Sequence, residues 1–267
     1  MRFRGLWAIA LRQYYLLKGS PARILPLFSW VGIDMILWGF MTRYLNSLGT
    51  SGFNFVPALL GAVLLWDFFT RAMQGLTTAF FEDVWSRNFL NVFSTPLTIP
   101  EYLGGLIVAS IGTSAVGLAI MVVLASGIFG LSFFAYGVFL IPFLLVLFLF
   151  GVAMGIVGVA LVLRMGPAAE WFVWPIPALI SPFAGVFYPL KTLPAWMQYL
   201  ARLLPPAYVF EGVRALVHGG QVEGQALLIA FLLALGYIAL ACWYFLKIFE
   251  RAVRTGLLAR YSAESVN

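Results

Sequence analysis

Residues 181–220 of the sequence read SPFAGVFYPLKTLPAWMQYLARLLPPAYVFEGVRALVHGG. This stretch begins as an apolar run of the kind that crosses a membrane, but prolines interrupt the run and recur beyond it, at positions 182, 189, 194, 205 and 206. A proline removes a helical hydrogen bond, and broken backbone at membrane depth is tolerated only against protein or a water-filled cavity. We therefore expect residues 168–188 to face a pathway or the protein interior rather than lipid.

The part of this stretch that follows Pro189 predicts two short amphipathic helices. The first places aromatic and leucine side chains on one face, namely Trp196, Tyr199, Leu200 and Leu203. The second carries an i, i+3 pair of opposite charges, Glu211 and Arg214. Interfacial aromatic residues favour a re-entrant hairpin over residues 189–220 in the outer leaflet, either as a gate or as an anchor with no gating role. The candidate gate residues are Phe187, Tyr188, Pro189, Trp196, Glu211 and Arg214.

Composition assigns the chain to the membrane. Of its 267 residues, 63% are hydrophobic and 10% are charged, whereas a soluble domain carries about 25% charged residues. A bilayer crossing needs roughly 20 apolar residues. The sequence therefore predicts an all-α integral membrane protein, residues 1–267 forming a single transmembrane domain. Its six predicted spans are 24–42, 53–81, 102–129, 133–163, 168–188 and 226–248.

The positions of the basic residues predict the orientation of these spans. With the amino terminus inside, 11 of the 16 Lys and Arg residues lie in cytoplasmic segments: Arg2, Arg4, Arg12, Lys18, Arg23, Arg87, Arg164, Lys247, Arg251, Arg254 and Arg260. The outer segments hold Arg43, Lys191, Arg202 and Arg214. Short cytoplasmic loops carry an excess of Lys and Arg. We therefore expect a multi-pass protein of the inner, cytoplasmic membrane with both termini in the cytoplasm, including a tail over residues 249–267.

Residues 1–22 predict an amphipathic helix that precedes the first span. Apolar residues recur there at helical spacing, among them Trp7 and Tyr14, while Arg4 and Arg12 project to other faces. Such a helix lies in the membrane interface with its rings in the acyl boundary and its cations toward the head groups. The alternative is a basic flank that only sets topology.

Small residues four apart predict close packing of the third and fourth spans, and they are Ala109, Thr113, Gly117, Gly151 and Gly155. Small side chains let helix backbones approach one another within a bilayer.

Residues 82–100 form the principal polar interruption on the inner side and predict a cytoplasmic coupling segment. Charged and apolar residues alternate there in the pattern of a short amphipathic helix, and Thr98 with Glu101 predicts a capping box that opens the next helix. The segment either seals the span ends or docks on a cytoplasmic partner. The docking candidates are Glu82, Arg87, Phe89, Leu90 and Phe93.

Three charged residues fall inside predicted spans: Asp34 in the first, and Asp67 and Arg71 in the second. Ionisable groups at such depth are costly and by default indicate a functional site. One interpretation is structural, with an Asp67–Arg71 bridge locking the helices. The other is an ion-coupled secondary transporter that uses all three residues.

The chain lacks the phosphate-binding loop of a P-loop ATPase. Its three lysines, Lys18, Lys191 and Lys247, each follow leucine, so the Gly-Lys of a phosphate-binding loop is absent. No catalytic constellation or metal-ligand spacing is present, with His218 the single histidine and Cys242 the single cysteine. Nothing indicates a nucleic-acid partner. We expect no enzyme activity and no cofactor in this chain, so driven transport needs another subunit or an ion gradient.

The stretch 181–220 resembles the segment after the fifth span in permeases of the ABC type-2 exporter family. The matching residues are Gly185, Val186, Phe187, Tyr188, Pro189, Leu193, Pro194, Pro206, Gly212 and Arg214, and the first coupling segment is matched by Glu82, Arg87, Thr95, Pro96 and Glu101. The resemblance implies a permease that pairs with a second copy of itself and with two copies of a separate ATPase, which binds ATP and Mg. It also implies export of an amphipathic substrate, such as a lipid-linked glycan or a drug-like molecule.

Overall fold

The computed structural model describes residues 3–48, 56–86, 88, 91–92 and 94–255, and no strand occurs among them. The α-helices are α1 (Phe3–Lys18), α2 (Pro21–Leu48), α3 (Gly61–Trp85), α5 (Ile99–Phe129), α6 (Leu140–Met165), α7 (Glu170–Val173), α8 (Ile176–Ala184), α9 (Ala195–Ala201), α10 (Pro205–Val217) and α11 (Gly224–Arg254). A π-helical turn, Val56–Leu60, precedes α3, and 3-10 turns occupy Phe133–Phe139, Pro167–Ala169 and Leu190–Thr192.

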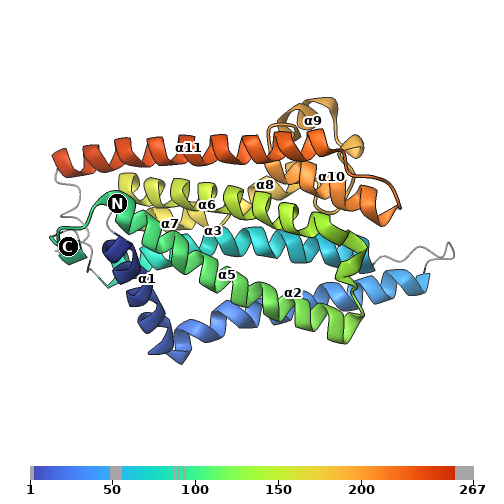
Figure 1. Ribbon diagram of the computed structural model, residues 1–267, viewed down its shortest axis with the longest axis horizontal. Coiled ribbons are helices and arrows are strands. Elements are labelled where there is room, and N and C mark those ends of the chain that lie inside the picture. The colour runs from blue at the N-terminus through green and yellow to red at the C-terminus, as the bar shows by residue number, and fades with distance from the viewer. Residues whose placement is uncertain (1–2, 49–55, 87, 89–90, 93, 256–267) are drawn as a thin grey trace.

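The long helices lie side by side in the order α11, α6, α3 and α5, and both α1 and α2 pack against α5 (Figure 1). The long helices α2, α3, α5 and α6 run in alternating directions along the long axis, and α11 runs in the same direction as α6 (Figure 1). As a result α1 and the last turn of α11 lie at one end of the molecule, which we call the α1 end, while α9 and α10 lie at the other, the α10 end (Figure 1). The central helices α3 and α6 are mostly buried, whereas only a minority of the residues in α5 and α11 are buried.

Four segments of the described chain are long and apolar enough to cross a membrane: Val56–Trp85, Ile99–Phe129, Tyr136–Met165 and Gly224–Arg254. They correspond to the second, third, fourth and sixth predicted spans. The first predicted span lies within α2, which has 28 residues. The fifth is not one continuous helix, because the run 168–188 divides into α7 and α8 on either side of Trp174 and Pro175. The total of six crossings remains a prediction.

Two of the predicted small residues, Gly151 and Gly155 of α6, allow α6 to approach α3 closely. A Cβ atom on Gly151 would lie 2.8 Å from the carbonyl oxygen of Phe69, and one on Gly155 would lie 3.1 Å from that of Met73. The aromatic rings of Phe69 and Phe150 stack beside this contact, with centroids 5.4 Å apart. The close approach predicted from the glycine spacing is therefore confirmed, and α3 is its partner.

The predicted capping box begins α5. Thr98 is the N-cap in extended conformation, Pro100 lies in the first turn, and the backbone N–H of Thr98 donates to Glu101 Oε2 at 2.9 Å. The helix ends at Gly130, whose φ of 69° is left-handed, with the N–H of Leu131 donating to the carbonyl of Ala125. These two signals fix both ends of the helix that packs against α1, α2 and α3.

Candidate functional site

A cavity of about 640 Å³, the polar cavity, lies between α1, α2, α3, α5 and the α7–α8 junction. All three predicted intramembrane charges line it. Its polar lining comprises Gln13, Asp34, Asp67, Thr70, Arg71, Gln74, Thr78, Glu82 and Thr113, and Trp30, Trp85 and Trp174 add aromatic walls. The structure thus gathers side chains that are far apart in sequence into one site within a membrane protein.

Helix α3 supplies most of this polar lining. Its polar residues Asp67, Arg71, Gln74, Thr78 and Glu82 recur every three or four positions, so they share one face of the helix. The opposite face is apolar and buried against α6. Sequence reasoning selected the charged members of the stripe and missed Gln74 and Thr78, although their helical spacing was visible.

One carboxylate oxygen of Asp67 takes no part in the predicted Asp67–Arg71 bridge. Asp67 Oδ2 is buried and has no hydrogen-bond partner within the part of the chain that the structure describes. A bridge from that atom to Arg71 is therefore not formed. The side chain of Arg71 lies along α5 instead, where a Cβ atom on Gly117 would come within 2.9 Å of Arg71 Cδ. A larger residue at position 117 would therefore crowd the side chain of Arg71.

At the α1 end of the polar cavity, a buried carboxylate joins three elements. Asp83 of α3 forms an ion pair with Arg12 of α1 and accepts a hydrogen bond of 2.8 Å from Tyr102 Oη of α5. Beside it, Gln13 Nε2 donates to the carbonyl of Ala79 at 3.1 Å. Burial lowers the pKa of Arg12, but the hydrogen bond and the charge of Asp83 outweigh burial and raise this pKa above its ordinary value.

This arrangement corrects the prediction that Arg12 faces head groups. Arg12 instead points into the protein, and the buried face of α1 consists of Ile9, Ala10 and Gln13. The aromatic rings of Trp7, Tyr14 and Tyr15 are exposed on the rest of the helix. The predicted helix exists, and it is docked on α3 and α5 through a polar contact that its hydrophobic periodicity did not show. Whether its exposed rings enter a membrane interface stays a prediction.

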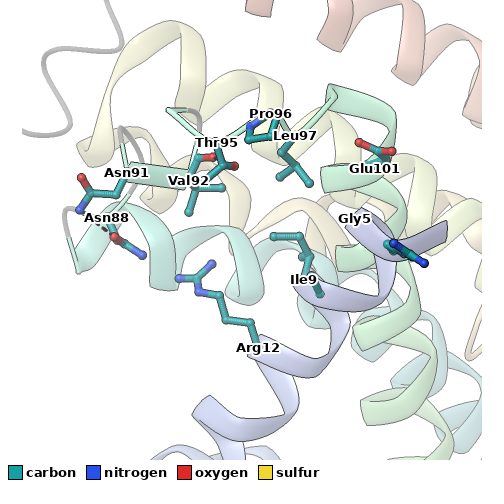
Figure 2. Close-up of a pocket in the computed structure, with 12 residues that line it drawn as sticks. Gly5, Ile9, Arg12, Asn88, Asn91, Val92, Thr95, Pro96, Leu97 and Glu101 are labelled. Carbon is teal, nitrogen blue, oxygen red and sulfur yellow. Dashed lines mark hydrogen bonds between the residues drawn. The ribbon is translucent and has the colours of Figure 1, made fainter. Parts of the chain in front are cut away.

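A second cavity, the α1 pocket, has a volume of about 1010 Å³ and lies at the α1 end (Figure 2). In Figure 2, Gly5, Ile9 and Arg12 of α1 face Asn88, Asn91, Val92 and Thr95 across the opening, with Glu101 at the start of α5. Both walls are part of the predicted interfacial helix and coupling segment. A partner that reaches this end of the molecule would therefore contact both elements.

The predicted docking residues fall in two groups. Glu82 lines the polar cavity rather than the α1 pocket. Arg87, Phe89, Leu90 and Phe93 lie outside the described residues. Their role as docking residues stays a prediction.

At the α10 end, two predicted gate residues hold a turn in place. Arg214 Nη2 pairs with Glu211 Oε1 at 2.8 Å, confirming the predicted i, i+3 contact. The same Glu211 oxygen accepts the N–H of Leu190 at 2.8 Å, and Arg214 Nη1 donates to the carbonyl of Gly185 at 2.6 Å. Gly185 has a φ of 63°, a conformation that favours glycine. The pair thus ties α10 to the turn over residues 185–190.

The other gate candidates lie on or near this turn. Phe187 stacks on Trp38 of α2, with centroids 4.9 Å apart, and Tyr188 Oη donates to the carbonyl of Pro182 at 2.7 Å. Pro189 precedes the 3-10 turn, and Trp196 packs edge-on against Phe183 while remaining 60% exposed. The turn over residues 185–190 therefore contacts α2 through Phe187 and α10 through the Glu211–Arg214 pair.

The two helices of the predicted hairpin differ in burial. The predicted apolar face of the first helix is exposed, with Trp196, Tyr199 and Leu200 on α9 and Leu203 just after it. In contrast, α10 packs against α6 and α11 and buries Val209, Phe210 and Val213. Only α9 therefore presents an apolar surface of the expected kind. A re-entrant position in a bilayer stays a prediction.

The sequence model of the family described as ABC-2 type transporter matches residues 5–218. The chain belongs to this family. As an ABC-2 family member it is a transmembrane permease component of an ABC transporter, and ATP hydrolysis in such transporters is carried by separate ATPase subunits. The matched residues include every residue that lines the polar cavity, and every residue that lines the α1 pocket except Arg4. A comparison with curated proteins finds no match.

Proposed function

We propose that this ABC-2 permease acts as a dimer, couples at its α1 end to two copies of a separate ATPase, and exports an amphipathic substrate. The observation that carries the proposal is the polar cavity, whose lining on α3 runs from Asp67 to Glu82 and Trp85. That lining ends beside Asp83, the residue that joins α3 to α1 and α5. The helix that would contact the substrate is therefore the helix that a cytoplasmic partner would move.

The contacts around Asp83 support this coupling. Its side chain contacts Arg12 and Tyr102, and its carbonyl accepts the N–H of Asn88, farther along the predicted coupling segment, at 3.1 Å. A displacement of residues 88–97 would reach α3 directly. ATP and Mg would bind the partner, and Arg87, Phe89, Leu90 and Phe93 would dock on it. This arrangement requires both termini of the chain to lie in the cytoplasm.

The α10 end supports a gate on the outer side of the inner membrane. The turn over residues 185–190 contacts α2 through the Phe187–Trp38 stack, and α2 also supplies Asp34 to the polar cavity. Movement of α2 would thus be transmitted to the turn. The outward face of α2 is apolar and exposed, with Ile33, Leu37, Phe40 and Tyr44, and the second copy of the permease would pack there.

The ion-coupled secondary transporter remains the second candidate, because Asp34, Asp67 and Arg71 do line one cavity. Family membership favours the ATP-driven permease. The two functions differ in their energy source, so an experiment can separate them.

The test is reconstitution of the full chain in liposomes with and without its ATPase. We expect the ATPase to co-purify with the permease and substrate export to require ATP. Phe89→Asp and Leu90→Asp should reduce co-purification, whereas Trp196→Asp, at the exposed α10 end, should leave it intact. Movement of substrate by the chain alone under a pH gradient, abolished by Asp67→Asn, would instead establish the secondary transporter.

A further inference from the structure

The charges that line the polar cavity are unbalanced. Among its described lining residues, three carboxylates, Asp34, Asp67 and Glu82, face one guanidinium, that of Arg71. Glu82 also interacts with Arg12, which lies outside this lining. Even without Glu82, the two aspartates outnumber the single guanidinium, so the cavity carries net negative charge when these groups are ionised. Its remaining polar lining consists of neutral amides and hydroxyls. The cavity therefore attracts positively charged molecules.

The buried carboxylate of Asp67 identifies where a cation would be held. Its Oδ2 atom is buried in the cavity wall and accepts no hydrogen bond from the described residues. An ionised carboxylate removed from water is costly unless a cation or a hydrogen-bond donor compensates it. Asp34 of α2 lines the same cavity, so a cation placed there can interact with carboxylates from two helices.

The aromatic walls favour an organic cation over a metal ion. Trp30, Trp85 and Trp174 line the cavity, and Trp85 is held by a hydrogen bond of 2.8 Å from its Nε1 to Glu170 Oε2. Indole rings bind both apolar surfaces and cations. The volume of about 640 Å³ falls within the range of roughly 300–1,000 Å³ typical of sites for drug-sized ligands.

We propose that the polar cavity binds an amphipathic organic cation, with its positive group beside Asp34 and Asp67 and its apolar groups against the tryptophans. The claim that this cation is the transported substrate rests on the proposed function above. The claim that the cavity binds it does not. Amphipathic anions would have to pair with Arg71, and we expect the cavity not to bind them.

Two probes of nearly the same shape and opposite charge test the proposal: tetraphenylphosphonium and tetraphenylborate. We expect the purified full chain, in nanodiscs of neutral phosphatidylcholine, to bind the cation at least tenfold more tightly than the anion. Asp34→Asn and Asp67→Asn should each weaken binding of the cation about tenfold. Glu250→Gln removes the same charge from an exposed position on α11 and should leave its affinity unchanged. Tighter binding of the borate, or unchanged affinity in both aspartate variants, would overturn the proposal.

A second measurement applies even if an aspartate variant fails to fold. Cys242 is the single cysteine, so Thr70→Cys in a Cys242→Ala background places one thiol in the cavity lining. Tetraphenylphosphonium should slow its reaction with a maleimide, and equal rates with and without the cation would refute binding in the cavity. Both measurements need no ATPase. Cation binding without ATP-driven transport would therefore contradict the proposed function alone.

Discussion

Arg12 of the amino-terminal helix forms an ion pair with Asp83, a fully buried residue of α3, across 71 positions of sequence. Tyr102 completes the contact from α5. The amino-terminal helix is therefore fastened to the helix that lines the polar cavity, and the fastening lies at the end of the molecule where α11 also ends (Figure 1).

Asp83→Leu should lower the free energy of unfolding by about 3 kcal/mol, because it leaves the partly buried Arg12 without its counter-charge. The double variant Arg12→Met/Asp83→Leu should recover most of that loss, since neither charge is then buried alone. Thermal unfolding of the purified protein in detergent measures both effects. Equal destabilisation in the single and double variants would show that the ion pair contributes nothing beyond packing.

Gly151→Ala should destabilise the protein by roughly 1–3 kcal/mol, because the added methyl group would meet the backbone of α3. Gly236→Ala on α11 is the matched control. It faces open space and replaces glycine within a helix, which typically stabilises by about 0.5–1 kcal/mol. Gly151→Ala should lower the unfolding temperature, and Gly236→Ala should raise it. An unchanged unfolding temperature in Gly151→Ala would contradict the close α3–α6 contact.

Glu211→Ala should speed hydrogen exchange at the amide of Leu190 by roughly ten- to a hundredfold, because a hydrogen bond to a carboxylate contributes about 1.5–3 kcal/mol. The amide of Leu193, which donates to the carbonyl of Leu190, reports on the turn as a whole. If the Leu190 amide exchanges at an unchanged rate, Glu211 does not hold this turn.

Local signals predicted much of this fold. The apolar runs located the four segments long enough to cross a membrane, Thr98 and Glu101 located the start of α5, and the i, i+3 spacing identified the Glu211–Arg214 pair. The prolines predicted a break in the fifth run, which the structure shows between α7 and α8. Each signal depends on residues close in sequence.

The polar contacts between helices could not be predicted in this way. Asp83 and Arg12 meet only because α1 packs against α5 beside the end of α3. Likewise, the spacing of Asp67 and Arg71 did not show that Asp67 Oδ2 has no hydrogen-bond partner among the described residues, or that the side chain of Arg71 lies along Gly117. Tertiary packing decides these contacts. The polar stripe on α3 was visible in the sequence, but not the cavity it lines.

The claim that the polar cavity is a pathway driven by an ATPase is tested most directly by labelling Thr70→Cys in the Cys242→Ala background. A membrane-impermeant thiol reagent is applied from either side of vesicles that contain the permease with its ATPase. We predict labelling from the cytoplasmic side without nucleotide, and a shift of labelling to the outer side when ATP and vanadate trap the ATPase. Labelling that is the same in both nucleotide states would contradict the account.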